Sequence, residues 1–162
     1  MSDYATHSND LLQLVSFVIE NEEYGIDILI VQEIIRPMTI TRVPNAPTFV
    51  EGVINLRGRI VPVVDLRKRF GLPTREMDKH TRIVVVELNQ KVVGFMMDAV
   101  REVIRVDRSV IEPPPDLATG IDTHYIKGVA KLEDRLLILL ELEEVLSDDE
   151  QSALHSPDSI AA

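Results

Sequence analysis

The chain has 162 residues, of which 45% are hydrophobic and 27% charged, and it carries a formal net charge of −10. This acidic balance disfavours nucleic acid and anionic membranes as partners, because both attract clustered Lys and Arg. The lack of cysteine excludes disulfides, thiolate nucleophiles and Cys-based zinc sites, and no apolar run approaches the roughly 20 residues that span a bilayer, so we expect a cytoplasmic protein without direct membrane insertion.

Aliphatic side chains must form most of the core, since aromatic residues make up only 4% of the chain and Trp is absent. The abundant β-branched residues favour sheet over helix. Apolar runs that are separated by turn residues predict a series of short strands. In chain order the expected strands are 11–19, 24–28, 52–56, 59–66, 82–88, 91–97, 127–132 and 135–140.

The segments between these strands carry signals of their own. The spacing of Ile28, Val31 and Ile34 fits either a short helix or a bent strand. Pro62 cannot donate a ladder hydrogen bond, so its strand is expected to be an edge strand or to carry a bulge there. The remaining expectations are two short helices, at 67–70 and 141–146, and two flexible ends, an N-terminus at 1–10 and an acidic tail at 148–162.

The chain contains an internal duplication. Residues 24–36 align with residues 93–105, and residues 52–66 align with residues 128–142, in the same order. The identical pairs are Gly25/Gly94, Val31/Val100, Glu33/Glu102, Ile35/Ile104, Arg36/Arg105, Gly52/Gly128, Val53/Val129, Leu56/Leu132, Arg59/Arg135 and Leu66/Leu142, and the conservative pairs include Ile34/Val103 and Ile60/Leu136. The shared glycines and the repeated Glu-x-Ile-Arg pattern favour a true repeat over chance similarity among Val-rich strands.

Each repeat is expected to form a small barrel. A unit of about 70 residues holds about five strands, and barrel closure removes exposed strand edges. One barrel of this size is marginal alone, so two should pack through a shared apolar seam. We therefore predict an all-β fold with one domain over residues 11–147, divided near residues 75–80 into two intertwined subdomains. A groove where the seam opens would be the natural place for a partner.

No group of residues predicts catalysis, a cofactor or a metal site. None of the four histidines, His7, His80, His124 and His155, has another histidine at ligand spacing. Phosphate-binding glycine loops and the G-x-S-x-G elbow are absent. Asp27, Asp65 and Asp98 lie beside apolar runs, and we expect them to cap turns or helices. A hydrolase that uses one of these acids is the minor alternative, since no nucleophile, base and orienting group occur together.

Two charged positions are candidates for partner binding. Gly58 is expected to supply a positive φ for a tight turn, from which Arg57 projects with a guanidinium suited to bidentate pairing; an ordinary exposed arginine is the alternative. The equivalent turn of the second repeat carries Glu133 and Asp134, so the fold does not require arginine there. Glu33 lies in an apolar strip and either points outward from core or rims a groove that accepts a partner's helix tip or loop.

At these residues the sequence resembles the bacterial chemotaxis coupling family CheW. The resemblance covers roughly residues 12–147, and its most specific part is the run 52–58, which includes Asn55-Leu56-Arg57-Gly58, followed by 60–67. It implies an all-β fold of two five-stranded, SH3-like barrels around a shared apolar core. The segments that carry it are 22–28, 31–34, 52–58, 60–67 and 92–94, together with Asp98 and residues 125–128.

The resemblance also implies a function. The chain would be a non-catalytic adaptor, monomeric in isolation, that couples the cytoplasmic tips of methyl-accepting chemoreceptors to the C-terminal regulatory domain of the histidine kinase CheA in membrane-associated arrays. A coupling adaptor of a non-flagellar pathway, such as one that controls pili, fits the same residues. The implied receptor-binding positions are Val31, Glu33, Arg57, Gly58, Val100 and Val103, and the implied kinase-binding positions are Ile111, Glu112 and Leu117.

Overall fold

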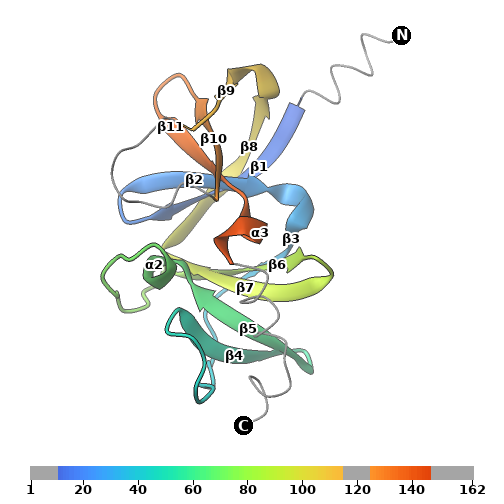
Figure 1. Cartoon of the computed structure of the whole chain (residues 1–162), viewed down its shortest axis with the longest axis vertical. Helices are drawn as coiled ribbons and strands as arrows, with labels where there is room; N and C mark the ends of the chain where they lie inside the picture. Colours follow the sequence, from blue (N-terminus) through green and yellow to red (C-terminus); the bar gives the residue numbers. More distant parts are fainter. Residues whose placement is uncertain (1–10, 115–124, 147–162) are drawn as a thin grey trace.

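The computed structural model describes residues 11–114 and 125–146, which form two lobes stacked along the long axis (Figure 1). No helix within these two ranges has the length and hydropathy to cross a membrane. The strands are β1 (Leu11–Ile19), β2 (Glu22–Asp27), β3 (Val31–Ile35), β4 (Val50–Leu56), β5 (Arg59–Asp65), β6 (Arg82–Leu88), β7 (Lys91–Met97), β8 (Ala99–Asp107), β9 (Ile111–Glu112), β10 (Ile126–Lys131) and β11 (Leu136–Leu140). Between them lie the 3₁₀ turns η1 (Ile28–Ile30) and η2 (Arg108–Val110) and the helices α2 (Leu66–Arg69) and α3 (Leu142–Val145).

The strands form two sheets, which confirms the predicted all-β fold. One sheet has six strands in the order β8-β1-β2-β11-β10-β9, and the other has five in the order β3-β6-β7-β5-β4. The expectation of five strands is correct for the second sheet only. The sixth strand of the first sheet is β9, whose two residues pair with Val129 and Ala130. At the same edge of the five-stranded sheet, the equivalent contact is a single bridge between Thr41 and Val53.

The two repeats exchange their first hairpins. The hairpin β1-β2 lies between β8 and β11, which belong to the second repeat, and the hairpin β6-β7 lies between β3 and β5 of the first. The exchanged hairpins make the two parallel pairings, with Gly25 opposite Leu139 and Gly94 opposite Val63. These are equivalent positions in the alignment of the repeats. Residues 75–80 join α2 to β6, and both sides of this segment contribute to the five-stranded sheet, so the lobes are not consecutive halves of the chain.

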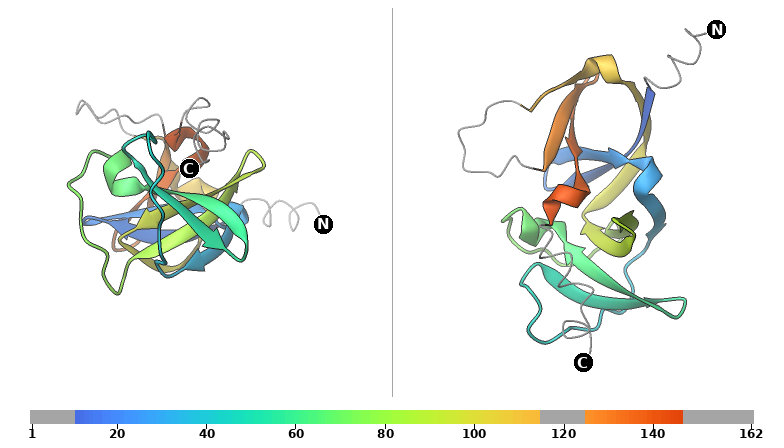
Figure 2. Two further views of the ribbon diagram at one scale, coloured as in Figure 1. Left: turned by 90° about the horizontal axis from the view of Figure 1, so that it is seen from below. Right: turned by 45° about the vertical axis from the view of Figure 1, so that its right-hand side comes forward.

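The main core lies between the two sheets, with a smaller apolar cluster inside each lobe. Four of the few aromatic residues form a ladder through this seam. Phe17 stacks on Tyr24 and Phe70 stacks on Tyr125, with centroid distances of 5.6 and 5.3 Å, and Tyr24 contacts Phe70 at 5.6 Å. The short helix α3 lies between the lobes in Figure 1 and in the right-hand view of Figure 2, and it buries Leu142 and Val145 in the seam.

Two local expectations have different outcomes. Residues 28–35 contain both alternatives, because the 3₁₀ turn η1 leads directly into the strand β3. The placement of Pro62 at an edge or bulge is wrong, since β5 is an interior strand between β7 and β4. Pro62 is opposite Val53, whose backbone N–H and C=O both bond to Thr41 on its other side. Pairing of β5 with β7 starts only at Val63, so the ladder needs no donor from Pro62.

Candidate functional site

The strands β3 and β8 occupy equivalent places in the two lobes. Each is the outermost strand at one end of its sheet, and each begins just after the chain crosses from the other sheet. Val31 on β3 and Val100 on β8 both pack against the core between the lobes. The duplication predicts this equivalence, because Val31 and Val100 are aligned and identical.

Farther along the same strands, apolar side chains become exposed. Ile34 is opposite Val84, and Val103 is opposite Val15. Directly paired residues project to the same face of a sheet, and Val84 and Val15 both belong to the core between the lobes. Ile34 and Val103 are nevertheless 41% and 53% exposed. They extend the buried seam into solvent at both edge strands.

We call this surface the edge-strand strip and define it by Val31, Ile34, Val100 and Val103. Three of its members, Val31, Val100 and Val103, are predicted receptor-binding positions. The fourth, Ile34, was not among the predicted site residues, although its alignment with Val103 in the duplication was the signal that could have identified it.

Of the other predicted receptor-binding residues, Arg57 and Gly58 form the tip of the β4-β5 hairpin, and Glu33 on β3 forms an ion pair with Arg57. Arg57 and Gly58 have φ values of 53° and 83°, as expected for a tight hairpin turn, and the Gly58 N–H donates to Asn55 Oδ1 at 2.8 Å. The Arg57 guanidinium binds both carboxylate oxygens of Glu33, with a distance of 2.8 Å from Nη1 to Oε1. This hydrogen bonding lowers the pKa of Glu33 below its usual value. The predicted exposure of Arg57 is confirmed, since 71% of its side chain is accessible.

Glu33 faces away from the edge-strand strip. It is opposite Val85, which belongs to the apolar cluster inside the five-stranded lobe. Its ion pair with Arg57 therefore closes the rim of this lobe by joining the hairpin tip to β3. The six predicted receptor-binding residues thus divide into an apolar group along the seam and a polar group, Glu33, Arg57 and Gly58, at the rim.

The second repeat has an ion pair at the equivalent place, which the sequence interpretation missed. Arg135 at the turn before β11 contacts Glu102 on β8 at 3.0 Å. It also lies 2.8 Å from Glu23 on β2, whose side chain is only 7% exposed. The alignment of Glu33 with Glu102 marked only the acid of this pair, because Arg135 aligns with Arg59 and not with Arg57.

The three aspartates singled out in the sequence have structural roles. Asp27 and Asp65 accept backbone N–H bonds from Leu29 and Arg67, both at 2.9 Å, and so cap η1 and α2 as expected. Burial raises the pKa of Asp65. Asp98 forms no helix cap and instead accepts a hydrogen bond from Arg67 at 2.5 Å. Across residues 11–114 and 125–146, no three or more His, Cys, Asp and Glu side chains are grouped to hold a metal.

The predicted kinase-binding residues lie only partly within the described chain. Ile111 on β9 is half-buried and packs against the cluster inside the six-stranded lobe. Glu112 is exposed and pairs with Lys131 at 2.8 Å. Leu117 lies outside the described residues.

The comparisons with known proteins agree with this architecture. The family model described as the CheW-like domain matches residues 13–150. The chain belongs to the CheW-like family. The chemotaxis protein CheW of Klebsiella aerogenes is 41% identical over 140 residues, which cover 86% of this chain and 84% of the relative. The CheW of Helicobacter pylori is 39% identical over 142 residues, which cover 88% and 86%.

A solved structure supports the fold as well as the family. The crystal structure of the scaffolding protein TtCheW from Thermoanaerobacter tengcongensis has a TM-score of 0.79 and 42% identity, covering 86% of this chain and 94% of that one. The resemblance stated from sequence motifs is therefore confirmed. The family match at residues 13–150 spans both repeats.

Proposed function

We propose that this chain is a non-catalytic scaffold of bacterial chemosensory signalling that couples chemoreceptors to the histidine kinase CheA. Its membership of the CheW-like family supports this role, since its relatives are named chemotaxis proteins and the similar solved structure is a scaffolding protein. The observation that carries the proposal is the edge-strand strip. Exposed Ile34 and Val103 continue the apolar seam at equivalent places on an otherwise acidic protein.

The receptor contact is proposed for the strip and the rim beside it. An apolar strip with an exposed cation nearby suits the tip of a helical hairpin, because apolar anchors supply affinity and a charged rim supplies register. Arg57 is exposed at the hairpin tip, where its guanidinium can exchange Glu33 for a carboxylate of the receptor. Recruitment to a membrane-associated array would follow from this contact.

The kinase contact is proposed at a different surface, around Ile111, Glu112 and Leu117. Glu112 is exposed on the short edge strand β9 and could pair with a cation of the kinase's regulatory domain. Separate surfaces would let one adaptor bind receptor and kinase together. It would transmit the receptor's state only if its contacts differ between the signalling states.

Calorimetry with a soluble chemoreceptor tip fragment and with the CheA regulatory domain tests the proposal. Val103→Asp places a charge in the strip and should weaken binding of the receptor fragment at least tenfold, with little effect on the kinase domain. Leu136→Asp is the matched control, because Leu136 is similarly exposed (59%) but lies on β11, outside the strip. Equal losses in the two variants, or binding of neither partner by the parent protein, would contradict the assignment.

The same measurement addresses the output pathway. Receptor fragments from flagellar and pilus-associated systems of one organism can be compared side by side. A preference of at least tenfold for one fragment would assign the pathway.

A further inference from the structure

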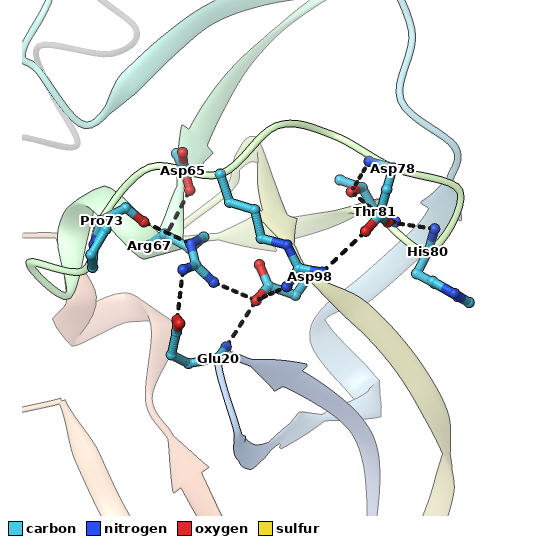
Figure 3. A network of polar contacts seen from close by, with 9 residues as sticks. Glu20, Asp65, Arg67, Pro73, Asp78, His80, Thr81 and Asp98 are labelled. Atoms are coloured by element: carbon cyan, nitrogen blue, oxygen red, sulfur yellow. Dashed lines mark hydrogen bonds and ion pairs between the residues drawn. The ribbon is translucent and has the colours of Figure 1, made fainter.

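A buried arginine joins the two lobes at one corner of the seam (Figure 3). The side chain of Arg67 on α2 is only 7% exposed. Its Nη2 bonds to Glu20 at 2.7 Å, its Nη1 bonds to Asp98 at 2.5 Å, and its Nε donates to the Pro73 carbonyl at 2.9 Å. All three nitrogens of the guanidinium are therefore used.

The partners of Arg67 come from different parts of the fold. Glu20 lies in the turn between β1 and β2, in the six-stranded lobe, while α2 directly follows β5 of the five-stranded lobe. Asp98 is the single residue between β7 and β8, where the chain crosses from one sheet to the other. The Glu20 N–H also donates to Asp98 Oδ2 at 2.8 Å, and Arg75 reaches the same oxygen at 3.2 Å. The network thus surrounds a crossing point.

Stability alone does not account for this network, because removing the charged groups from water costs much of the free energy that their pairing returns. Burial by itself would lower the pKa of Arg67, and only Glu20 and Asp98 reverse this effect and raise the pKa above its usual value. Buried ion pairs seldom exceed well-packed apolar residues in stability, but they restrict the arrangement of the groups around them. The equivalent position in the second repeat is Glu143 on α3, so the repeated fold does not itself require arginine.

Asp98 is well placed to control the edge-strand strip. Within the described residues, the chain passes between the sheets at η1, which leads into β3, and at Asp98, which leads into β8. Val100 follows Asp98 by only two residues, so a movement of Asp98 is passed along the strand to Val100 and Val103. The two sides of the strip therefore begin at the two crossings.

We propose that Arg67 is a positioning residue that sets the spacing between the β3 and β8 sides of the edge-strand strip. It acts through Asp98, which it holds against α2 and the β1-β2 turn. Its importance for receptor binding rests on the function proposed above, but its effect on the spacing exists without any partner.

The spacing can be measured directly, because the chain has no native cysteine. Spin labels at Arg36→Cys and Arg105→Cys, two exposed and equivalent positions at the far ends of the strip, report the distance by double electron–electron resonance. The parent protein should give one narrow distribution. Arg67→Met should shift the mean of the distance distribution or at least double its width. Arg67→Lys retains the positive charge but loses the planar guanidinium that bonds Glu20 and Asp98 together, and it should give an intermediate result.

Arg75→Met is the matched control. Arg75 also contacts Asp98, but its side chain is 50% exposed, so its loss should leave the distribution unchanged. A folded Arg67→Met protein with the parent distribution would overturn the proposal. If Arg67→Met does not fold, Asp98→Ala removes the carboxylate through which Arg67 acts, at a side chain that is only 9% exposed, and should broaden the distribution; an unchanged result there overturns the proposal equally.

Binding of the receptor fragment separates this proposal from the function it rests on. Arg67→Met should weaken that binding at least tenfold while kinase-domain binding is retained. If the distances change but the parent protein binds no receptor fragment, the positioning role stands and the receptor assignment fails. If the parent binds and Arg67→Met changes neither distance nor affinity, the positioning role fails alone.

Discussion

The two lobes share their strand pairing but are closed by different polar contacts. Both have an exchanged hairpin, a parallel pair at an aligned glycine and a bulge at a second aligned glycine. In the five-stranded lobe, the closing arginine is Arg57 at an exposed hairpin tip, paired with the half-exposed Glu33. In the six-stranded lobe it is Arg135, which also neutralises the buried Glu23. The two repeats therefore share a backbone arrangement but differ in the charged side chains that close each lobe.

This difference separates a contact that is available to a partner from one that is part of the fold. Arg57 can turn towards another carboxylate at small cost, because both members of its pair remain hydrated. Arg135 cannot leave without depriving the buried Glu23 of its closest cation, since the other one, Arg101, is 3.7 Å away and 53% exposed. The short helices also differ in charge, since α2 carries the buried Arg67 and α3 carries Glu143 at the aligned position.

The largest expected effect tests the shared backbone at the bulge glycines. A Cβ at Gly52 would lie 2.1 Å from the Thr41 carbonyl oxygen, and the φ of Gly52 is +149°. At Gly128 the nearest atoms, including the Glu112 carbonyl oxygen, would be 2.8 Å away. Gly52→Ala should therefore reduce the free energy of unfolding by about 3 kcal/mol or more, and Gly128→Ala by about 1–2 kcal/mol.

Urea denaturation followed by circular dichroism measures both glycine variants under one set of conditions. The order of the two losses is the decisive result. Equal losses of unfolding free energy would mean that the Thr41 segment moves away from an added Cβ as readily as β9 does. The sheet edges of the two lobes would then be equally deformable.

A smaller effect separates the two closing arginines. Arg135→Met should lower the midpoint of thermal unfolding, because it leaves the carboxylate of Glu23 buried without its closest cation. Arg57→Met should lower the midpoint much less, since its side chain is 71% exposed. The double variant Arg135→Met with Glu23→Gln should recover part of the loss. A midpoint that falls equally in both single variants would remove the distinction between the lobes.

Much of the fold follows from local sequence signals. Apolar periodicity located eight of the eleven strands of the described residues, but it missed β8 and β9 and left β3 as one of two alternatives. The positive-φ turns at Arg57-Gly58 and Asn89-Gln90 lie where turn residues interrupt the periodicity. The exchange of hairpins could not be predicted in the same way, because periodicity shows which face of a strand is buried and not which strand lies beside it. The interior position of Pro62 has the same cause, since it depends on where pairing with β7 begins.

The candidate site was predictable from the family resemblance, which implied Val31, Val100 and Val103, and from the turn residues at Arg57-Gly58. The alignment of the repeats also contained the pairs Ile34/Val103 and Glu33/Glu102, which mark Ile34 and Glu102. Arg67 and Asp98 are 31 residues apart and have no aligned counterparts as a pair. Only the three-dimensional crossing of the chain brings them together, so their contact had no signal in the sequence.

The smallest effect concerns pH and has opposite signs at two acids. The hydrogen bonds from Arg57 lower the pKa of Glu33 in the folded protein, so this pair contributes stability above the unfolded pKa and loses it as the pH falls through the folded pKa. Burial raises the pKa of Asp65, although the Arg67 amide opposes the shift. Its contribution is therefore present below the unfolded pKa and is lost as the pH rises through the folded pKa.

Carboxyl carbon NMR titration resolves the two acids individually. Glu33 should titrate below, and Asp65 above, the ordinary range of its residue type, and Arg57→Met should return Glu33 to that range without moving Asp65. Asp65→Asn keeps an acceptor for the Arg67 amide but cannot ionise. The substitution should therefore raise the free energy of unfolding more at neutral pH than at acidic pH. If Glu33 titrates normally in the parent protein, its pair with Arg57 does not persist in solution. Arg57 could then bind a partner's carboxylate without first breaking an ion pair with Glu33. The rim of the five-stranded lobe would also have no ion pair comparable to those that Arg135 makes in the six-stranded lobe.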